Sequence, residues 1–122
     1  MANLFDAVTE VESNNNPLAA SIKGARGLMQ ITQPALTDYN TYNKAEYNME
    51  DMFDPELNTT VGRWYLSNRI PTMLKAFKLP VTLDNILWAY NAGIGNVVKG
   101  IKPEETVAYI EKVKSKLEEV KE

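Results

Sequence analysis

Residues 11–30, VESNNNPLAASIKGARGLMQ, are the most informative part of the chain. Apolar residues at helical spacing run into this stretch and predict a first helix over residues 3–13. A run of asparagines and Pro17 should end that helix, because the residue before a proline is pushed away from helical angles. Two glycines then bracket a short apolar turn or helix at residues 24–31, where a ligand could approach the backbone closely.

Glu12 is the residue of this stretch with the clearest chemical potential. At 100° per residue it lies about 20° from Phe5 and about 40° from Val8 around the first helix, so one carboxyl group falls within the apolar stripe. Burial disfavours the charged form, so the pKa of Glu12 should be raised, as a general acid near neutral pH requires. A core carboxylate paired with Arg26 or Lys23 would explain the same position, and helical geometry alone does not separate the two interpretations.

Composition narrows the possible chemistry. The 122 residues, 44% apolar and 24% charged, fit one globular domain over residues 1–122. The absence of cysteine and histidine excludes disulfides, thiolate chemistry, imidazole catalysis and histidine metal sites. A net charge of −3 argues against nucleic acid, and no apolar stretch is long enough to span a bilayer. We therefore expect a monomer with no metal, cofactor, nucleic-acid or membrane partner.

Helical spacing dominates the chain and predicts an all-α domain of six to eight helices with short connections. A short helix is expected at residues 34–40, followed by an irregular loop at residues 41–52. Tyr39, Tyr42 and Tyr47 in this region could stack on a sugar, although tyrosines in loops more often lie simply on the surface.

The second half of the chain predicts three more helical segments. Asp54 should cap the first, which Pro71 should break or kink. The second is capped by Thr82 or Asp84 and ends at a glycine. The last begins at Pro103 and continues to the end of the chain. Its expected apolar seam consists of Val107, Ile110, Val113, Leu117 and Val120.

Two further motifs could contribute to a site. Gln30, which follows the glycine turn, offers an amide for hydrogen bonds to a ligand. The segment Trp88-Ala89-Tyr90-Asn91-Ala92-Gly93 ends a helix, and Tyr90 could place its hydroxyl in a cleft while its ring packs. Taken singly, each motif is better explained by ordinary structure, namely a tight loop before core residues and a helix end with a glycine cap.

Together and in this order, the motifs resemble the catalytic domain of the soluble lytic transglycosylase (SLT) family, which has a goose-type-lysozyme-like fold. The resemblance extends over residues 5–113 and departs from the family pattern at Asn15, at Gln33 before Pro34, at residues 37–52 and at Pro71. The matching segments are Glu12-Ser13, Asn16-Pro17, Ser21, Gly24-Ala25, Gly27-Leu28-Met29-Gln30, Asp54-Pro55, Ala89-Tyr90-Asn91-Ala92-Gly93 and Glu105-Thr106-Val107-Ala108-Tyr109.

The resemblance implies a peptidoglycan lytic transglycosylase with a glycan-binding groove. Glu12 would protonate the β-1,4 glycosidic oxygen between N-acetylmuramic acid and N-acetylglucosamine. It would then take the proton of the muramyl C6 hydroxyl to give a 1,6-anhydromuramyl end. The substrate's N-acetyl oxygen would replace a second carboxylate at C1. The residues implied to line the groove or support Glu12 are Ser13, Ser21, Gly27, Met29, Gln30, Tyr90, Asn91, Ala92 and Tyr109.

Two alternatives stay open. A hydrolytic goose-type-like lysozyme would hold water with an acid such as Asp38 or Asp51, and a glycan-binding module without activity would merely retain the groove. The single-carboxylate interpretation expects no second acid from the matching motifs. Glycan strands of peptidoglycan, the expected partner, lie outside the cytoplasm, yet residues 1–13 show no secretory signal. We therefore expect action at the cell wall or periplasm, either by a phage-delivered or virion-associated lysin or by a domain excised from an exported protein.

Overall fold

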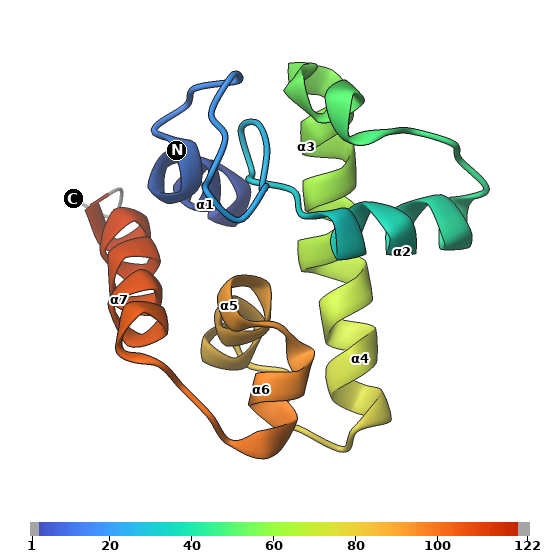
Figure 1. Ribbon diagram of the computed structural model, residues 1–122. Coiled ribbons are helices and arrows are strands. Elements are labelled where there is room, and N and C mark those ends of the chain that lie inside the picture. The colour runs from blue at the N-terminus through green and yellow to red at the C-terminus, as the bar shows by residue number, and fades with distance from the viewer. Residues whose placement is uncertain (1–2, 120–122) are drawn as a thin grey trace.

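The computed structural model describes residues 3–119 as an all-α domain, in agreement with the predicted fold class. Helices α3, η2 and α4 follow one another without a gap, so the described residues form six separate α-helical stretches, within the predicted range (Figure 1). The elements are α1 (Leu4–Ser13), α2 (Gln33–Asn43), the 3-10 helix η1 (Met49–Phe53), α3 (Pro55–Trp64), the π-helical turn η2 (Tyr65–Arg69), α4 (Ile70–Ala76), α5 (Leu83–Ala92), α6 (Ile94–Lys99) and α7 (Glu104–Glu119).

Helix α1 ends where the sequence predicts, through the asparagines that follow it. Asn14 and Asn15 adopt left-handed φ angles of 55° and 62°, which asparagine tolerates better than most residues. The loop beyond them is a turn rather than a helix. Arg26 forms isolated antiparallel bridges with Ala20 and with Ile31, which fold the chain back on itself.

The expected break at Pro71 does not occur. Asp54 caps α3 as predicted, because its Oδ1 accepts from the amides of Glu56 at 2.9 Å and Leu57 at 3.1 Å. The helix then continues through Pro71 as one long run in Figure 1. Proline lacks the N–H that would bond to the carbonyl four residues earlier, and the π turn η2, closed by Ile70 N–H to Tyr65 O, directly precedes it. The hydrogen-bond pattern that Pro71 disturbs therefore changes only in this π turn, and the helix continues.

The middle of the chain contains more helix than predicted, and polar caps explain this difference. Helix α2 extends three residues past the expected end, and η1 forms inside the expected loop. Asn48 and Asp51 bond to each other's backbone amides in a capping box that begins η1. At α5 the Thr82 hydroxyl accepts from the amide of Asn85 at 3.1 Å, which selects Thr82 over Asp84 as the cap.

The buried face of α7 departs from the predicted seam only in its first turns, where it is rotated away from Val107 toward Thr106 and Tyr109. Val107 is 46% exposed, whereas Thr106 is fully buried and Tyr109 is 6% exposed. Ile110 and Val113 are buried as expected; Leu117 packs against the core, and Val120 lies outside the described residues. Helix α7 lies beside α1 and α5 (Figure 1), so this rotation turns Tyr109 inward, toward the end of α1.

Candidate active site

A cleft of about 190 Å³ opens where the C-terminal ends of α1 and α5 meet the start of α7 and the loop after α1. Five of the residues singled out from the sequence line it together: Glu12, Ser21, Gln30, Tyr90 and Asn91. The structure adds four residues that sequence reasoning did not assign to a site, namely Lys23, Ala25, Thr32 and Glu105.

Glu12 has the electrostatic environment predicted from the helical pattern. Burial raises the pKa of its carboxyl to about 7 from 4.5, and the Tyr109 hydroxyl opposes part of that rise by interacting with the ionised form. The alternative of a core ion pair with Arg26 is wrong, because Arg26 Nη1 lies 2.7 Å from Glu50 Oε1. Lys23, the other predicted partner, lines the cleft with an exposed side chain and is not in the core. Glu12 is therefore a half-buried carboxyl group that is protonated at mildly acidic pH.

Two tyrosines lie close to Glu12: Tyr109 is buried and Tyr90 is partly buried. Burial raises the pKa of Tyr90 and of Tyr109 well above the usual range, and the charge of Glu12 adds to both shifts, so both hydroxyls stay protonated. Tyr90 donates to the carbonyl of Met29 at 2.6 Å. The Tyr109 hydroxyl is buried, and among the described residues it is the one buried side-chain polar atom that makes no hydrogen bond of regular geometry. Glu12 and Tyr90 both act on this hydroxyl, which remains available to the Glu12 carboxyl.

The loop that carries Gln30 is held by polar side chains. Gln30 Nε2 donates to the carbonyls of Ala19 at 3.2 Å and Gly27 at 2.9 Å, so a hydrogen bond to a ligand would use its side-chain oxygen. Asn58 on α3 is fully buried and accepts from the amide of Met29 at 2.8 Å. Its Nδ2 donates to the carbonyls of Arg26 and Met52, each at 2.8 Å. Sequence reasoning missed Asn58, although a polar residue beside the apolar face of α3 was a usable signal.

Glu105 corrects the expectation that the matching motifs supply no second acid. It lies in the Glu-Thr-x-x-Tyr segment and lines the same cleft as Glu12, with an exposed side chain. The next residue, Thr106, donates to Asn91 Oδ1 at 2.8 Å and ties the start of α7 to the end of α5. Asp38 and Asp51, the acids suggested for a lysozyme, do not line the cleft: Asp38 pairs with Arg69, and Asp51 belongs to the capping box.

Five residues of the implied site are not among the cleft-lining residues: Tyr109, whose hydroxyl interacts with Glu12, and four whose surroundings are structural. Ser13 donates to the carbonyl of Thr9, and Ala92 offers its carbonyl to Asn96. The Met29 side chain is fully buried in the core. Gly27 has a φ of 79°, and a Cβ there would collide with the Met52 carbonyl and the Asn58 amide. Its lack of a side chain serves internal packing.

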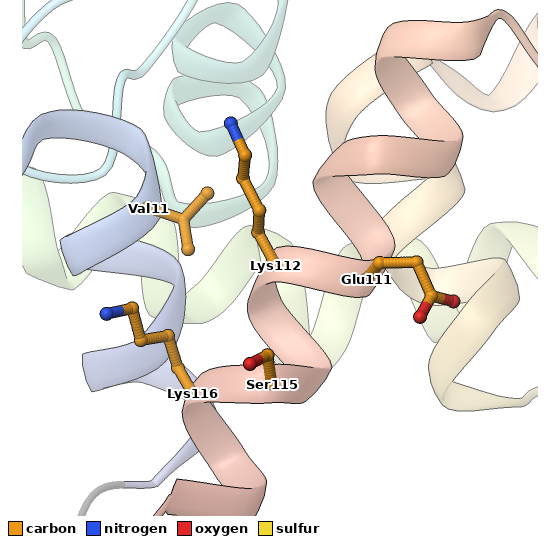
Figure 2. A pocket seen from close by; sticks show the side chains of 5 residues that line it. All are labelled: Val11, Glu111, Lys112, Ser115 and Lys116. Atoms are coloured by element: carbon orange, nitrogen blue, oxygen red, sulfur yellow. The ribbon is translucent and has the colours of Figure 1, made fainter.

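A cavity larger than the cleft lies elsewhere. A groove of about 490 Å³ runs between α1 and α7, lined by Val11, Glu111, Lys112, Ser115 and Lys116. In Figure 2 Val11 and the two lysines project into the space between the helices, while Glu111 points to the other side of α7. Lys116 reaches Glu10 on α1 at 3.0 Å. The groove shares no residue with the cleft at Glu12.

The described residues offer neither a metal site nor a membrane-spanning helix. Among the side chains described, those of residues 3–117, no group of three or more acidic residues could hold a metal ion. None of the described helices is long and apolar enough to cross a membrane.

This chain is a helical domain of the lysozyme-like class, with a half-buried glutamate in a cleft between helix ends. Residues 1–113 match the Transglycosylase SLT domain, and the chain belongs to this family. A similar solved structure is the 70 kDa soluble lytic transglycosylase of Escherichia coli, with a TM-score of 0.74 and 27% identity over 90% of this chain and 20% of that chain.

Curated relatives agree with this membership. The chain is 32% identical to membrane-bound lytic murein transglycosylase C of Pectobacterium atrosepticum, over 79% of this chain and 28% of the relative. It is 33% identical to membrane-bound lytic murein transglycosylase F of the same organism, over 81% of this chain and 19% of the relative. The chain thus spans less than a third of the length of these relatives.

Proposed function

We propose that this domain is a peptidoglycan lytic transglycosylase that cleaves the β-1,4 bond between N-acetylmuramic acid and N-acetylglucosamine. The observation that carries the proposal is Glu12, a half-buried carboxyl whose pKa of about 7 suits proton donation near neutral pH. The lytic murein transglycosylases among the relatives support the same activity. The proposed site of action is the bacterial cell wall; delivery by a phage stays a prediction from the sequence.

In the proposed reaction Glu12 acts first as acid and then as base. Protonated Glu12 donates to the glycosidic oxygen as the bond from C1 to that oxygen breaks, and the substrate's N-acetyl oxygen stabilises C1. The ionised carboxylate then takes the proton of the muramyl C6 hydroxyl while that oxygen bonds to C1. Glu12 is thereby protonated again and no water is consumed. The Tyr109 hydroxyl, without another partner, supports the ionised carboxylate between the two steps.

The test is mass spectrometry of the soluble products from purified peptidoglycan. We expect fragments lighter by one water than reducing-ended ones, and a Glu12→Gln variant should lose at least about 100-fold in rate. Glu10→Gln is the matched control, because Glu10 lies two residues earlier on α1 but pairs with Lys116 outside the cleft. A Glu12→Gln variant that keeps substantial activity would overturn the proposal.

Glu105 carries the second candidate, a hydrolytic lysozyme in which this carboxylate holds the attacking water. Its place in the cleft beside Glu12 is the observation in favour. Reducing-ended products, lost in a Glu105→Gln variant, would assign the chain to this class. Anhydro-ended products that persist in that variant would leave Glu105 without a chemical role.

A further inference from the structure

A second, small cavity of about 20 Å³ adjoins the cleft at the start of α2. It shares Gln30, Thr32 and Tyr90 with the cleft and adds Ile31, Ala35 and Tyr65. Tyr65 touches Tyr90 with ring centroids 6.2 Å apart, so one aromatic contact links the two cavities. The space beside Glu12 therefore leads toward the facing sides of α2 and η2.

Two helix faces form the walls of this continuation. Ala35, Asp38 and Tyr42 lie within about 60° of one another around α2, and Tyr42 is two turns, or about 10 Å, beyond Ala35. Tyr65 and Arg69 are one turn apart on η2. We call Asp38, Tyr42, Tyr65 and Arg69 the α2 arm.

Ion-pair and ring contacts hold the α2 arm together. Arg69 Nε lies 3.1 Å from Asp38 Oδ2 and joins the two walls, and its guanidinium carbon lies 4.6 Å from the Tyr42 ring centroid. The Asp38 and Arg69 charges both act on the half-buried Tyr65 hydroxyl, which places all three groups together. Trp64 fixes the far end, because its ring lies 6.0 Å from Tyr42 and 6.3 Å from Tyr65. Despite these contacts the Tyr42 side chain is 60% exposed.

We propose that the α2 arm is a distal subsite for a sugar ring of the same glycan strand that occupies the cleft, with the exposed Tyr42 ring as its stacking platform. This inference rests on the proposed function and extends it. An exposed aromatic face held in a fixed orientation costs little entropy when it stacks on a flat apolar face of a sugar. The paired Asp38 and Arg69 offer acceptors and donors to sugar hydroxyls and N-acetyl groups beside that ring.

Continuity with the cleft is what commits the α2 arm to a glycan. Tyr65 joins the arm to the cleft, because it lines the small cavity that shares three residues with the cleft and its ring contacts that of Tyr90. Tyr42 lies in the segment at residues 37–52 that departs from the family pattern, so the subsite belongs to this chain's own sequence. The arm would favour long strands over short fragments, because only a long strand reaches Tyr42 while it also fills the cleft.

The test is binding of glycan strands separated by length and prepared both with and without their stem peptides, in the Glu12→Gln background that prevents turnover. Tyr42→Ala should weaken binding of long strands by about threefold to tenfold, the range of one aromatic contact, and leave the shortest bound fragment unchanged. Tyr42→Phe should retain the affinity, because stacking needs the ring and not the hydroxyl. Phe77→Ala, which removes a 52% exposed ring at the end of α4, is the matched control and should change nothing.

The outcomes separate this inference from the function on which it rests. If the Tyr42→Ala protein binds long strands as well as its parent, or loses long and short strands equally, the subsite is wrong while the transglycosylase proposal stands. An effect confined to strands that still carry stem peptides would assign the arm to peptide and overturn a sugar subsite. A parent protein that binds no glycan and releases no product would overturn the proposed function as well.

Discussion

At the scale of single residues, local patterning was enough to find Glu12, whereas Tyr109 was named only through the family resemblance. The position of Glu12 follows from the 100° step of a helix and the apolar residues around it, which is local information. Tyr109 is distant in sequence, and it faces Glu12 because the first turns of α7 are rotated from the predicted seam. The threonine at 106 and the tyrosine at 109 are less apolar than the exposed Val107, so hydropathy alone favoured the wrong face.

The raised pKa of Glu12 predicts a pH dependence of stability. The carboxyl titrates near 4.5 when exposed and near 7 in the fold, so between these values the folded protein binds more protons than the unfolded one. The free energy of unfolding should therefore fall as pH rises from 4.5 to 7, by about 3 kcal/mol at about 1.4 kcal/mol per pKa unit. Below pH 4.5 this contribution is fully present.

Urea unfolding of the parent protein and of Glu12→Gln between pH 4.5 and 8 measures this effect. The variant has no carboxyl at this position, so its stability relative to the parent should increase across the window and level off above pH 7. Parallel pH profiles for the two proteins would mean that Glu12 titrates as an exposed glutamate. In that case its suitability as a general acid would lose its physical basis.

At the scale of elements, the sequence located the helices better than the loop that shapes the site. Caps are local signals: Asp54 is confirmed, and Thr82 is one of the two caps that the sequence predicts for α5. The loop at residues 17–32 depends instead on Asn58, which lies on α3 and satisfies three backbone groups of two other segments. Its conformation is a tertiary effect, and no spacing within the loop encodes it.

Two glycines of this loop provide a matched test of that packing. Gly24 and Gly27 have φ angles of 91° and 79°, so alanine is strained at both, at about 1–2 kcal/mol. A Cβ at Gly24 would meet nothing within 4 Å, whereas at Gly27 it would collide with the Met52 carbonyl and Asn58. Gly27→Ala should therefore lower the free energy of unfolding by about 1–3 kcal/mol more than Gly24→Ala.

Chemical denaturation of both variants, with the parent as reference, gives this difference. Equal losses would show that the loop moves away from Asn58 at little cost. The sequence interpretation, in which Gly27 lets a glycan pass close to the backbone, makes the opposite prediction: an unchanged stability and a loss of glycan binding.

At the scale of the whole molecule, the site exists only because distant segments converge. The ends of α1 and α5 and the start of α7 form the cleft, and they are separated by most of the chain. Only the family resemblance, which relates complete motif order to a known fold, anticipated this convergence. The family resemblance did not predict the α2 arm, because residues 37–52 match no family motif. The Tyr42 ring of this segment contacts Trp64 and Arg69, which lie on other elements.

The core predicts that the cleft and the α2 arm unfold as one unit. One buried cluster is built around α1, α2, α3 and α7, and a second around α4, α5 and α6. Tyr65, Ile86, Trp88 and Tyr90 pack against both clusters, so neither can open without exposing apolar surface of the other. A domain of this size with such shared contacts should unfold in a single transition.

Tryptophan fluorescence measures the unfolding of each region separately. The chain has two tryptophans: Trp64 contacts the Tyr42 ring of the α2 arm, and Trp88 packs against both buried clusters. In Trp64→Phe and Trp88→Phe variants, the remaining tryptophan reports on one region, and its fluorescence transition in urea should coincide with the far-UV circular dichroism transition of the same variant. A Trp64 signal lost at lower urea than the helical signal would mean that the α2 arm opens on its own. A rigid stacking platform at Tyr42 requires the first result, because an arm that opened independently would lose the preorganisation on which its affinity for a sugar depends.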